Sequence, residues 1–203
     1  MKTSINTVLA AGALSIGLFM QPTTGLAAGY QVGKDKPRFN TQGELLQPNG
    51  FRNWVFIGSP LTPHALNGGS AAFPEYHNVY VQPQALAHYM KTGEWPEGTM
   101  MVKELQLTKE GTHPDGSRNE VSGRGYFPAE PNGLDVSVKD SRRFSSTRNW
   151  GFFNFGHHAP PYTASAAPAP VSACAECHTA NAHEDMVFSD FYAQLKPLPT
   201  KRK

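Results

Sequence analysis

The segment Cys174-Ala175-Glu176-Cys177-His178 holds the residues of this chain whose types and spacing point most clearly to chemistry. Two thiols one helical turn apart can add to the two vinyl groups of one haem, and the adjoining imidazole can ligate its iron. The motif therefore predicts a haem c bound through Cys174 and Cys177, with His178 as the proximal iron ligand. A redox-active cysteine pair or half of a zinc site is the alternative. The chain has only these 2 cysteines to complete a zinc site, and no βαβ pattern surrounds the motif.

The beginning of the chain has the layout of a cleaved secretory signal. Lys2 is followed by an apolar run over residues 8–20 and by small residues around Ala28. We therefore expect residues 1–28 to be removed, and the apolar run is too short to span a bilayer. Export together with covalent haem predicts a periplasmic protein that has no membrane anchor.

The composition favours a β-rich fold. A net charge of +2 with 17% charged residues predicts no polyanionic partner such as nucleic acid. The 19 glycines and 17 prolines indicate many short strands joined by turns, rather than a helical bundle. We expect a mainly β (α+β) fold, with an antiparallel sheet, a few short helices and a C-terminal haem-attachment segment. Residues 29–203 are expected to form a single domain.

Alternating hydrophobicity locates the first strands. Three segments rich in β-branched and aromatic side chains are the expected strands: residues 51–58, 76–81 and 99–107. A helix is expected over residues 83–91, because Pro83 suits a first helical turn. In the third strand the two-residue period puts Lys103 on the same face as Met101 and Leu105. An inward amine is unfavourable unless it is neutral, paired or chemically consumed, although a lysine at a strand edge can also reach water.

The second half of the chain predicts further strands ended by turns. The expected strands are residues 123–127, 134–138 and 149–155. Residues 128–133 contain two prolines and are expected to break the sheet. Residues 159–171, rich in proline and alanine, are expected to be a linker to the haem motif, and residues 187–195 a final helix.

The chain offers no evident sixth ligand for the iron. Met186 is the only methionine after the motif, and it lies too close to His178 in sequence to reach the opposite face of the haem readily. An electron-transfer cytochrome usually needs such a ligand. The sequence therefore favours an open iron site over a plain electron carrier.

The order of short motifs along the chain resembles that of the cytochrome P-460 family. The motifs are Tyr76-His77-Asn78-Val79-Tyr80, residues 87–94, residues 97–104, Gly125-Tyr126-Phe127, Val138-Lys139-Asp140, Trp150-Gly151-Phe152 and the haem motif. The resemblance implies a β-rich homodimer with a five-coordinate haem c. It also implies that a lysine corresponding to Lys103 is covalently joined to the porphyrin, which would remove the cost of an inward amine. The similar cytochromes c′-beta lack this lysine and bind gases.

The activity implied by the resemblance is the oxidation of hydroxylamine to nitrous oxide or nitrite, by way of an iron nitrosyl. Electrons would pass to an external acceptor, such as a small cytochrome. Glu130 is the first candidate for the base that takes protons from the substrate. Ala129 is an alternative occupant of that position, and Glu130 can equally be a solvated loop carboxylate. The alternative function is binding or sensing of nitric oxide at an unmodified haem, and the state of Lys103 separates the two.

Two further residues are candidates for the side of the haem opposite His178. His77 lies on the inner face of its expected strand and corresponds to a polar position of the family, so it can hydrogen-bond a bound ligand or a haem propionate. Phe73 is a candidate aromatic wall above the iron. Each can instead be an ordinary core residue. His157 and His158 are interpreted as surface residues, although either could contact a propionate.

Overall fold

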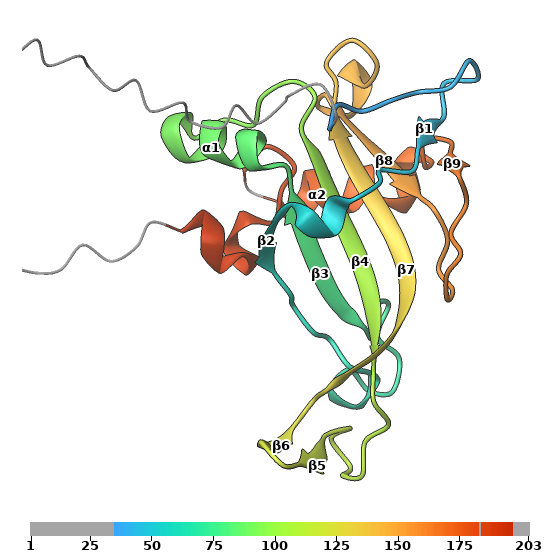
Figure 1. The fold of residues 1–203 in the computed structure, drawn as a ribbon, viewed down its shortest axis with the longest axis vertical. Helices are drawn as coiled ribbons and strands as arrows, with labels where there is room; N and C mark the ends of the chain where they lie inside the picture. Colours follow the sequence, from blue (N-terminus) through green and yellow to red (C-terminus); the bar gives the residue numbers. More distant parts are fainter. Residues whose placement is uncertain (1–34, 183, 197–203) are drawn as a thin grey trace, which may run out of the picture. The chain divides into compact units, whose positions relative to one another are not determined.

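The computed structural model describes residues 35–182 and 184–196 of the chain. Its centre is an antiparallel sheet in the order β2-β3-β4-β7-β8 (Figure 1). These strands are β2 Val55–Gly58, β3 Tyr76–Val81, β4 Met100–Thr108, β7 Pro128–Lys139 and β8 Trp150–Asn154. The prediction of a mainly β (α+β) fold is confirmed. The expected signal peptide, residues 1–28, lies outside the described residues.

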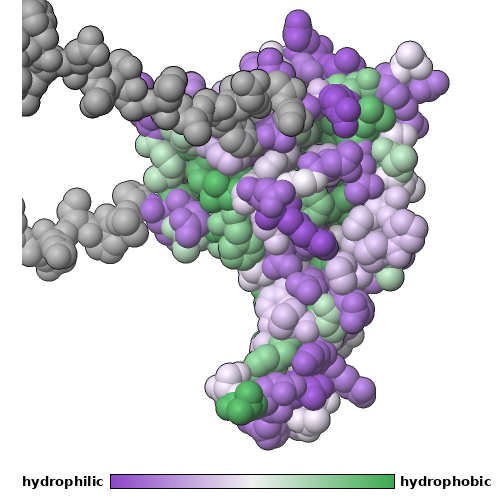
Figure 2. Space-filling view, in the orientation of Figure 1, coloured by the Kyte–Doolittle hydropathy of each residue, from purple (hydrophilic) through white to green (hydrophobic). Residues whose placement is uncertain are grey.

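Two small sheets accompany the central one. β1 Leu45–Leu46 pairs with β9 Ser165–Ala166, so residues 159–171, expected as a linker, also contribute a strand. β5 Arg118–Glu120 and β6 Gly123–Gly125 form a hairpin at the far end of β4 and β7 (Figure 1). Val121 in its turn is exposed, and the end of this hairpin carries an apolar (green) surface in Figure 2.

The described helices are short. The α-helices are α1 Pro83–Thr92 and α2 Ala175–Asn181. The 3-10 turns are η1 Phe51–Asn53, η2 His64–Leu66, η3 Ser145–Thr147, η4 Val171–Ala173, η5 Ser189–Phe191 and η6 Ala193–Leu195. As predicted, α1 has Pro83 in its first turn. The helix ends at Gly93, whose φ of 77° suits a residue without a side chain. Within residues 35–182 and 184–196, no helix is both long and apolar enough to cross a bilayer.

Three predictions about secondary structure are wrong. β7 continues through residues 128–133, because β8 pairs with β7 only from Asp135 onward and leaves this part at an edge, where prolines are tolerated. Register shifts opposite Gln106 absorb the irregularity. Residues 187–195 form η5 and η6 instead of a helix, since Leu195 is buried while Phe191 is exposed. The expected strand over residues 51–58 starts at β2, after the η1 turn.

Each face of the central sheet buries a different set of side chains. On one face, alternate residues of β4 and β7 join the arm before β2 in an apolar cluster that includes Leu45, Met100, Val102, Leu134, Val136, Val138 and Phe153. On the other face, the residues between them pack against α2 and the chain that follows it, in a cluster that includes Val79, Met101, Phe152, Ala175, Met186 and Val187. The second face carries the predicted site.

Candidate functional site

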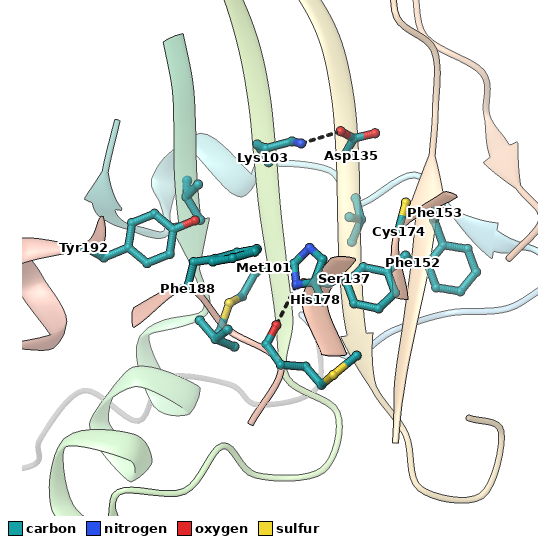
Figure 3. A pocket seen from close by; sticks show the side chains of 14 residues that line it. Met101, Lys103, Asp135, Ser137, Phe152, Phe153, Cys174, His178, Phe188 and Tyr192 are labelled. Carbon is teal, nitrogen blue, oxygen red and sulfur yellow. Dashed lines mark hydrogen bonds and ion pairs between the residues drawn. The ribbon is translucent and has the colours of Figure 1, made fainter. Parts of the chain in front are cut away.

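A cavity lies between the second face of the sheet, α2 and residues 186–192 (Figure 3). Its lining includes Met101, Lys103, Asp135, Ser137, Cys174 and His178. The fold therefore brings the haem motif, near the end of the described chain, against the strand that carries Lys103.

The cysteines are presented at the start of α2. Ala175 is 4% exposed and packs in the cluster on the sheet, which anchors the first turn of the helix. Cys174 precedes that turn and is half-buried, Cys177 follows on its exposed side, and both thiols are free. Burial, followed by the charge of Asp135, raises the pKa of the Cys174 thiol. Two thiols at this spacing can bond to one haem.

His178 is held in one orientation. Its ring packs between Phe152 and Phe188, with centroid distances of 4.4 and 4.8 Å. Its Nδ1 donates a hydrogen bond to the carbonyl oxygen of Met186 at 2.7 Å, which leaves Nε2 directed toward Lys103 and Asp135 (Figure 3). Burial is the main cause that lowers the pKa of His178. A lowered pKa favours the neutral imidazole, and its Nε2, which has no hydrogen-bond partner among the described residues, can serve as an iron ligand.

The turn that supplies this carbonyl is itself anchored to the sheet. Asp185 and Met186 have φ values of 47° and 63°, a conformation that such residues rarely adopt. The Asp185 carboxylate accepts hydrogen bonds from Trp150 Nε1 at 3.1 Å and from the ammonium of Lys139. These bonds fix the turn and hence the orientation of His178. Met186 lies on the side of His178, in agreement with the prediction that it is no sixth ligand.

The strand register divides this face of the sheet into three levels, each consisting of residues paired across β3, β4 and β7. The first level is Val81, Met101 and Ser137, the second is Val79, Lys103 and Asp135, and the third is His77, Leu105 and Gly133. Neighbouring levels are two residues apart, or roughly 7 Å along a strand. His178 packs on Phe152, which pairs with Ser137 in the first level. The third level therefore lies at the end of this sheet face that is farther from His178, with the second level between them.

Lys103 points inward, as alternation predicts, and it is paired. Its Nζ is 2.9 Å from Asp135 Oδ2 and 4.2 Å from the centre of the Phe73 ring. The two charged side chains are 28% and 24% exposed, so the pair is neither deeply buried nor fully solvated. Of the alternatives for an inward amine, this chain shows pairing with a carboxylate and an aromatic ring.

The structure does not bring Glu130 to this pair. Glu130 is exposed on β7, and its side chain forms no hydrogen bond or ion pair with the described residues. The carboxylate beside Lys103 belongs to Asp135, which the sequence did not single out. Alternation does put Asp135 on the face opposite Leu134 and Val136, and an inward lysine calls for a nearby carboxylate, so these two signals together could have identified it.

The predicted residues Phe73 and His77 do lie beside Lys103. The Phe73 ring meets the His77 ring edge-on, with centroids 5.8 Å apart, and His77 Nε2 lies 3.3 Å from the Phe73 carbonyl oxygen. Burial, followed by the charge of Lys103, lowers the pKa of His77. The Phe73 ring is also stacked on the ring of His157, at an interplanar angle of 21°. His157 is partly exposed, as predicted, but it also pairs with a buried acid.

These residues fit a haem c. Cys174 and Cys177 provide the two thiols, and His178 provides a neutral, oriented nitrogen donor. The cavity wall is mainly apolar, with polar groups that include Lys103, Asp135 and Ser137, and it suits a macrocycle with a polar edge. Within the described chain, no group of three or more His, Cys, Asp or Glu residues is placed so that it could hold a metal ion.

A comparison with protein families agrees with this interpretation. The family model described as Cytochrome P460 matches residues 48–189, which span all five strands of the central sheet, α1 and α2. No curated protein matches the chain.

Proposed function

The chain belongs to the cytochrome P460 family of haem c oxidoreductases, and on this basis we propose that it oxidises hydroxylamine at an open haem iron in the periplasm. The observation that carries the proposal is the inward Lys103 on the cavity wall, in the level of the sheet toward which the free nitrogen of His178 points. We further propose that the protein is a homodimer and that its electrons pass to an external acceptor, such as a small cytochrome.

The roles of the haem-binding residues follow from their positions. Cys174 and Cys177 would hold the haem covalently, and His178 Nε2 would ligate the iron. The bound haem would supply an iron that takes up electrons from a coordinated substrate. The anchored carbonyl of Met186 keeps the imidazole oriented and increases its basicity, as hydrogen-bond partners of metal-ligating histidines do.

Lys103 and Asp135 have different proposed roles, one in modifying the haem and the other in accepting protons. We propose that Nζ of Lys103 is bonded to the porphyrin edge, which would alter the electronic structure of the macrocycle. In that state Lys103 no longer pairs as a cation, and Asp135 becomes an available carboxylate at the substrate side. Asp135 therefore replaces Glu130 as the proposed base, because it is 2.9 Å from Nζ whereas Glu130 is exposed elsewhere on β7.

A second candidate function is the binding or sensing of nitric oxide. It is favoured by the same ion pair, since Asp135 and the Phe73 ring already satisfy the Lys103 ammonium without any covalent bond. In this alternative the haem is unmodified and Phe73 limits the space available to a ligand.

Mass spectrometry of the haem peptide separates the two functions. We expect haem released by proteolysis to carry both the Cys174-to-His178 segment and a peptide from β4 that contains Lys103. Lys103→Met should lose the second peptide and hydroxylamine oxidation, while it keeps the thioether-bound haem and nitric oxide binding. Lys109→Met is the matched control, because Lys109 pairs with Glu120 at 3.8 Å on the distant hairpin. A wild-type haem peptide without the Lys103 segment would favour the gas-binding function instead.

A further inference from the structure

Glu75 is a buried acid with one unused oxygen. It lies directly before β3, and its side chain is 2% exposed. Its Oε1 accepts hydrogen bonds from Asn132 Nδ2 at 2.8 Å and His157 Nε2 at 2.7 Å, whereas the buried Oε2 has no partner within the described part of the chain. An unsatisfied buried polar atom costs about 1–3 kcal/mol. Such an arrangement is expected where a structure uses the group chemically.

The hydrogen bonds keep this acid ionised. Burial raises the pKa of Glu75, but the hydrogen bonds from His157, Asn132 and its own backbone amide, together with the charge of His157, outweigh burial, and the net pKa is lowered. The Glu75 carboxylate can only accept, so Nε2 of His157 carries the hydrogen of their bond. Nδ1 of His157 is then the nitrogen that can take up a further proton.

Residues from three separate segments of the chain form the hydrogen bonds of the Glu75–His157 pair. Asn132 lies next to the register shift of β7, and Glu75 precedes β3. His157 follows Gly156, which has a φ of 132° and whose carbonyl oxygen accepts a hydrogen bond from the Leu134 amide at 3.1 Å. Because residues with a side chain rarely adopt this φ, glycine is required for the turn that carries the chain from β8 to His157.

The pair borders the third level of the sheet, on the side opposite His178. The His157 ring is stacked on Phe73 with centroids 6.0 Å apart, and Phe73 in turn contacts His77 and the Lys103 ammonium. The His157 side chain is 41% exposed. It therefore extends from a buried carboxylate to solvent, beside the aromatic ring that covers the Lys103 region.

We propose that His157, held by Glu75, exchanges protons between solvent and ligands that enter on the side of the haem opposite His178. This rests on the proposed function only in requiring an open iron site. When a ligand enters as a neutral acid and binds as its anion, its proton would leave the ligand and bond to Nδ1 of His157. The Glu75 carboxylate stabilises the resulting imidazolium, and Nδ1 then releases the proton to water.

Other titratable groups near the pair have to be distinguished from it. The charges of Lys103, Glu75 and Asp135 all affect the pKa of His77, because these groups lie near its ring. His158 is next in the chain, is exposed and has its Nδ1 at 2.7 Å from the Ala159 carbonyl oxygen. His77 is thus the competing proton acceptor, and His158 is a matched control for the substitution of a neighbouring histidine.

Cyanide binding to the ferric holoprotein tests the proposal without any turnover of hydroxylamine, because hydrogen cyanide must lose a proton to bind as an anion. The association rate is measured by stopped flow across the pH range from about 5 to 9. We expect His157→Gln to slow the association roughly tenfold or more and to remove its low-pH inflection. Glu75→Gln should change both the rate and its pH profile, because the protonated His157 ring loses the carboxylate that holds it. His158→Gln should behave as the wild type.

The possible results separate this proposal from the proposed function. An unchanged rate and inflection in His157→Gln would overturn the proposal, and so would an inflection that disappears in His77→Asn but persists in His157→Gln. A Glu75→Gln profile identical to the wild type would exclude Glu75 as the positioning residue. If the wild type binds no cyanide, the iron site is closed and both proposals fail. If cyanide binding depends on His157 but hydroxylamine is not oxidised, only the proposed function fails.

Discussion

The two faces of the central sheet are built from the same strands but differ in the polarity of the side chains that they carry. One face of β4 and β7 presents Met100, Val102, Leu134, Val136 and Val138, all at most 3% exposed. The other face of the same strands presents Met101, Lys103, Asp135 and Ser137 to the cavity. Because successive side chains of a strand point to opposite faces, stability and chemistry can be assigned to alternate residues of one segment.

An ion pair on each face can be compared, and the two differ in burial. On the apolar face, Arg52 binds Glu104, whose side chain is 6% exposed while that of Arg52 is 62% exposed. On the cavity face, Lys103 and Asp135 share a similar, intermediate exposure. The first pair neutralises a carboxylate inside the core, whereas the second leaves both partners accessible to a cofactor. This difference predicts separate consequences for stability and for haem chemistry.

The largest effect on stability is expected from the apolar face. Leu134→Ala removes a side chain that is 0% exposed, and the cavity left behind should lower the free energy of unfolding by about 2–5 kcal/mol. The haem absorption spectrum should not change, because Leu134 faces away from the cavity. Denaturant unfolding followed by circular dichroism measures the loss. Leu107→Ala, at a residue that is 38% exposed, is the control and should stay within about 0.5 kcal/mol of the wild type.

Removing one partner of each ion pair compares the faces directly. Arg52→Met leaves the Glu104 carboxylate buried without its guanidinium, which should cost about 1–3 kcal/mol. The double variant with Glu104→Met should recover much of this loss, because an apolar pair suits a core. Lys103→Met should cost less than about 1 kcal/mol, since that pair is partly solvated. Equal losses in Arg52→Met and Lys103→Met, measured by the same unfolding experiment, would contradict the proposed division between the faces.

The sequence predicts the parts of this fold that depend on local patterns. β3 matches residues 76–81, and α1 ends within one residue of its predicted end because Pro83 and Gly93 mark its boundaries. β7 through residues 128–133 was missed, because a proline at a sheet edge is acceptable only when the neighbouring strand starts later. That information lies in the pairing of distant segments rather than in the residues themselves.

The same distinction applies to the site. Cys174, His178 and Lys103 were found because a motif and a two-residue period are local features. Asp135 became part of the site through the register that places it opposite Lys103. The pairing of Glu75 with His157 joins residues 82 positions apart, through a turn and a strand irregularity. Neither the alternation within one strand nor the composition of a loop could predict that contact.

The smallest effect is expected at the boundary of the cavity face, from the protonation of His77. Burial, with the charge of Lys103 as the second cause, lowers its pKa, so the unfolded chain takes up this proton at a higher pH than the folded chain does. Above about pH 6.5 the residue is neutral in both states and its contribution to stability is fully present. As the pH falls from there through the folded pKa, the unfolded state binds more protons and the free energy of unfolding declines. The slope from one such group is at most about 1.4 kcal/mol per pH unit.

His77→Asn should remove that decline, so that the difference in unfolding free energy between about pH 7.5 and pH 5.5 becomes smaller than in the wild type. His88→Asn, an exposed position on α1, is the control and should leave the difference unchanged. A His77→Asn variant with the wild-type slope would mean that His77 is solvated in the folded protein. The cavity face would then be open to water at its third level, and Phe73 would not cover the ligand side as its contacts with His77 and Lys103 indicate.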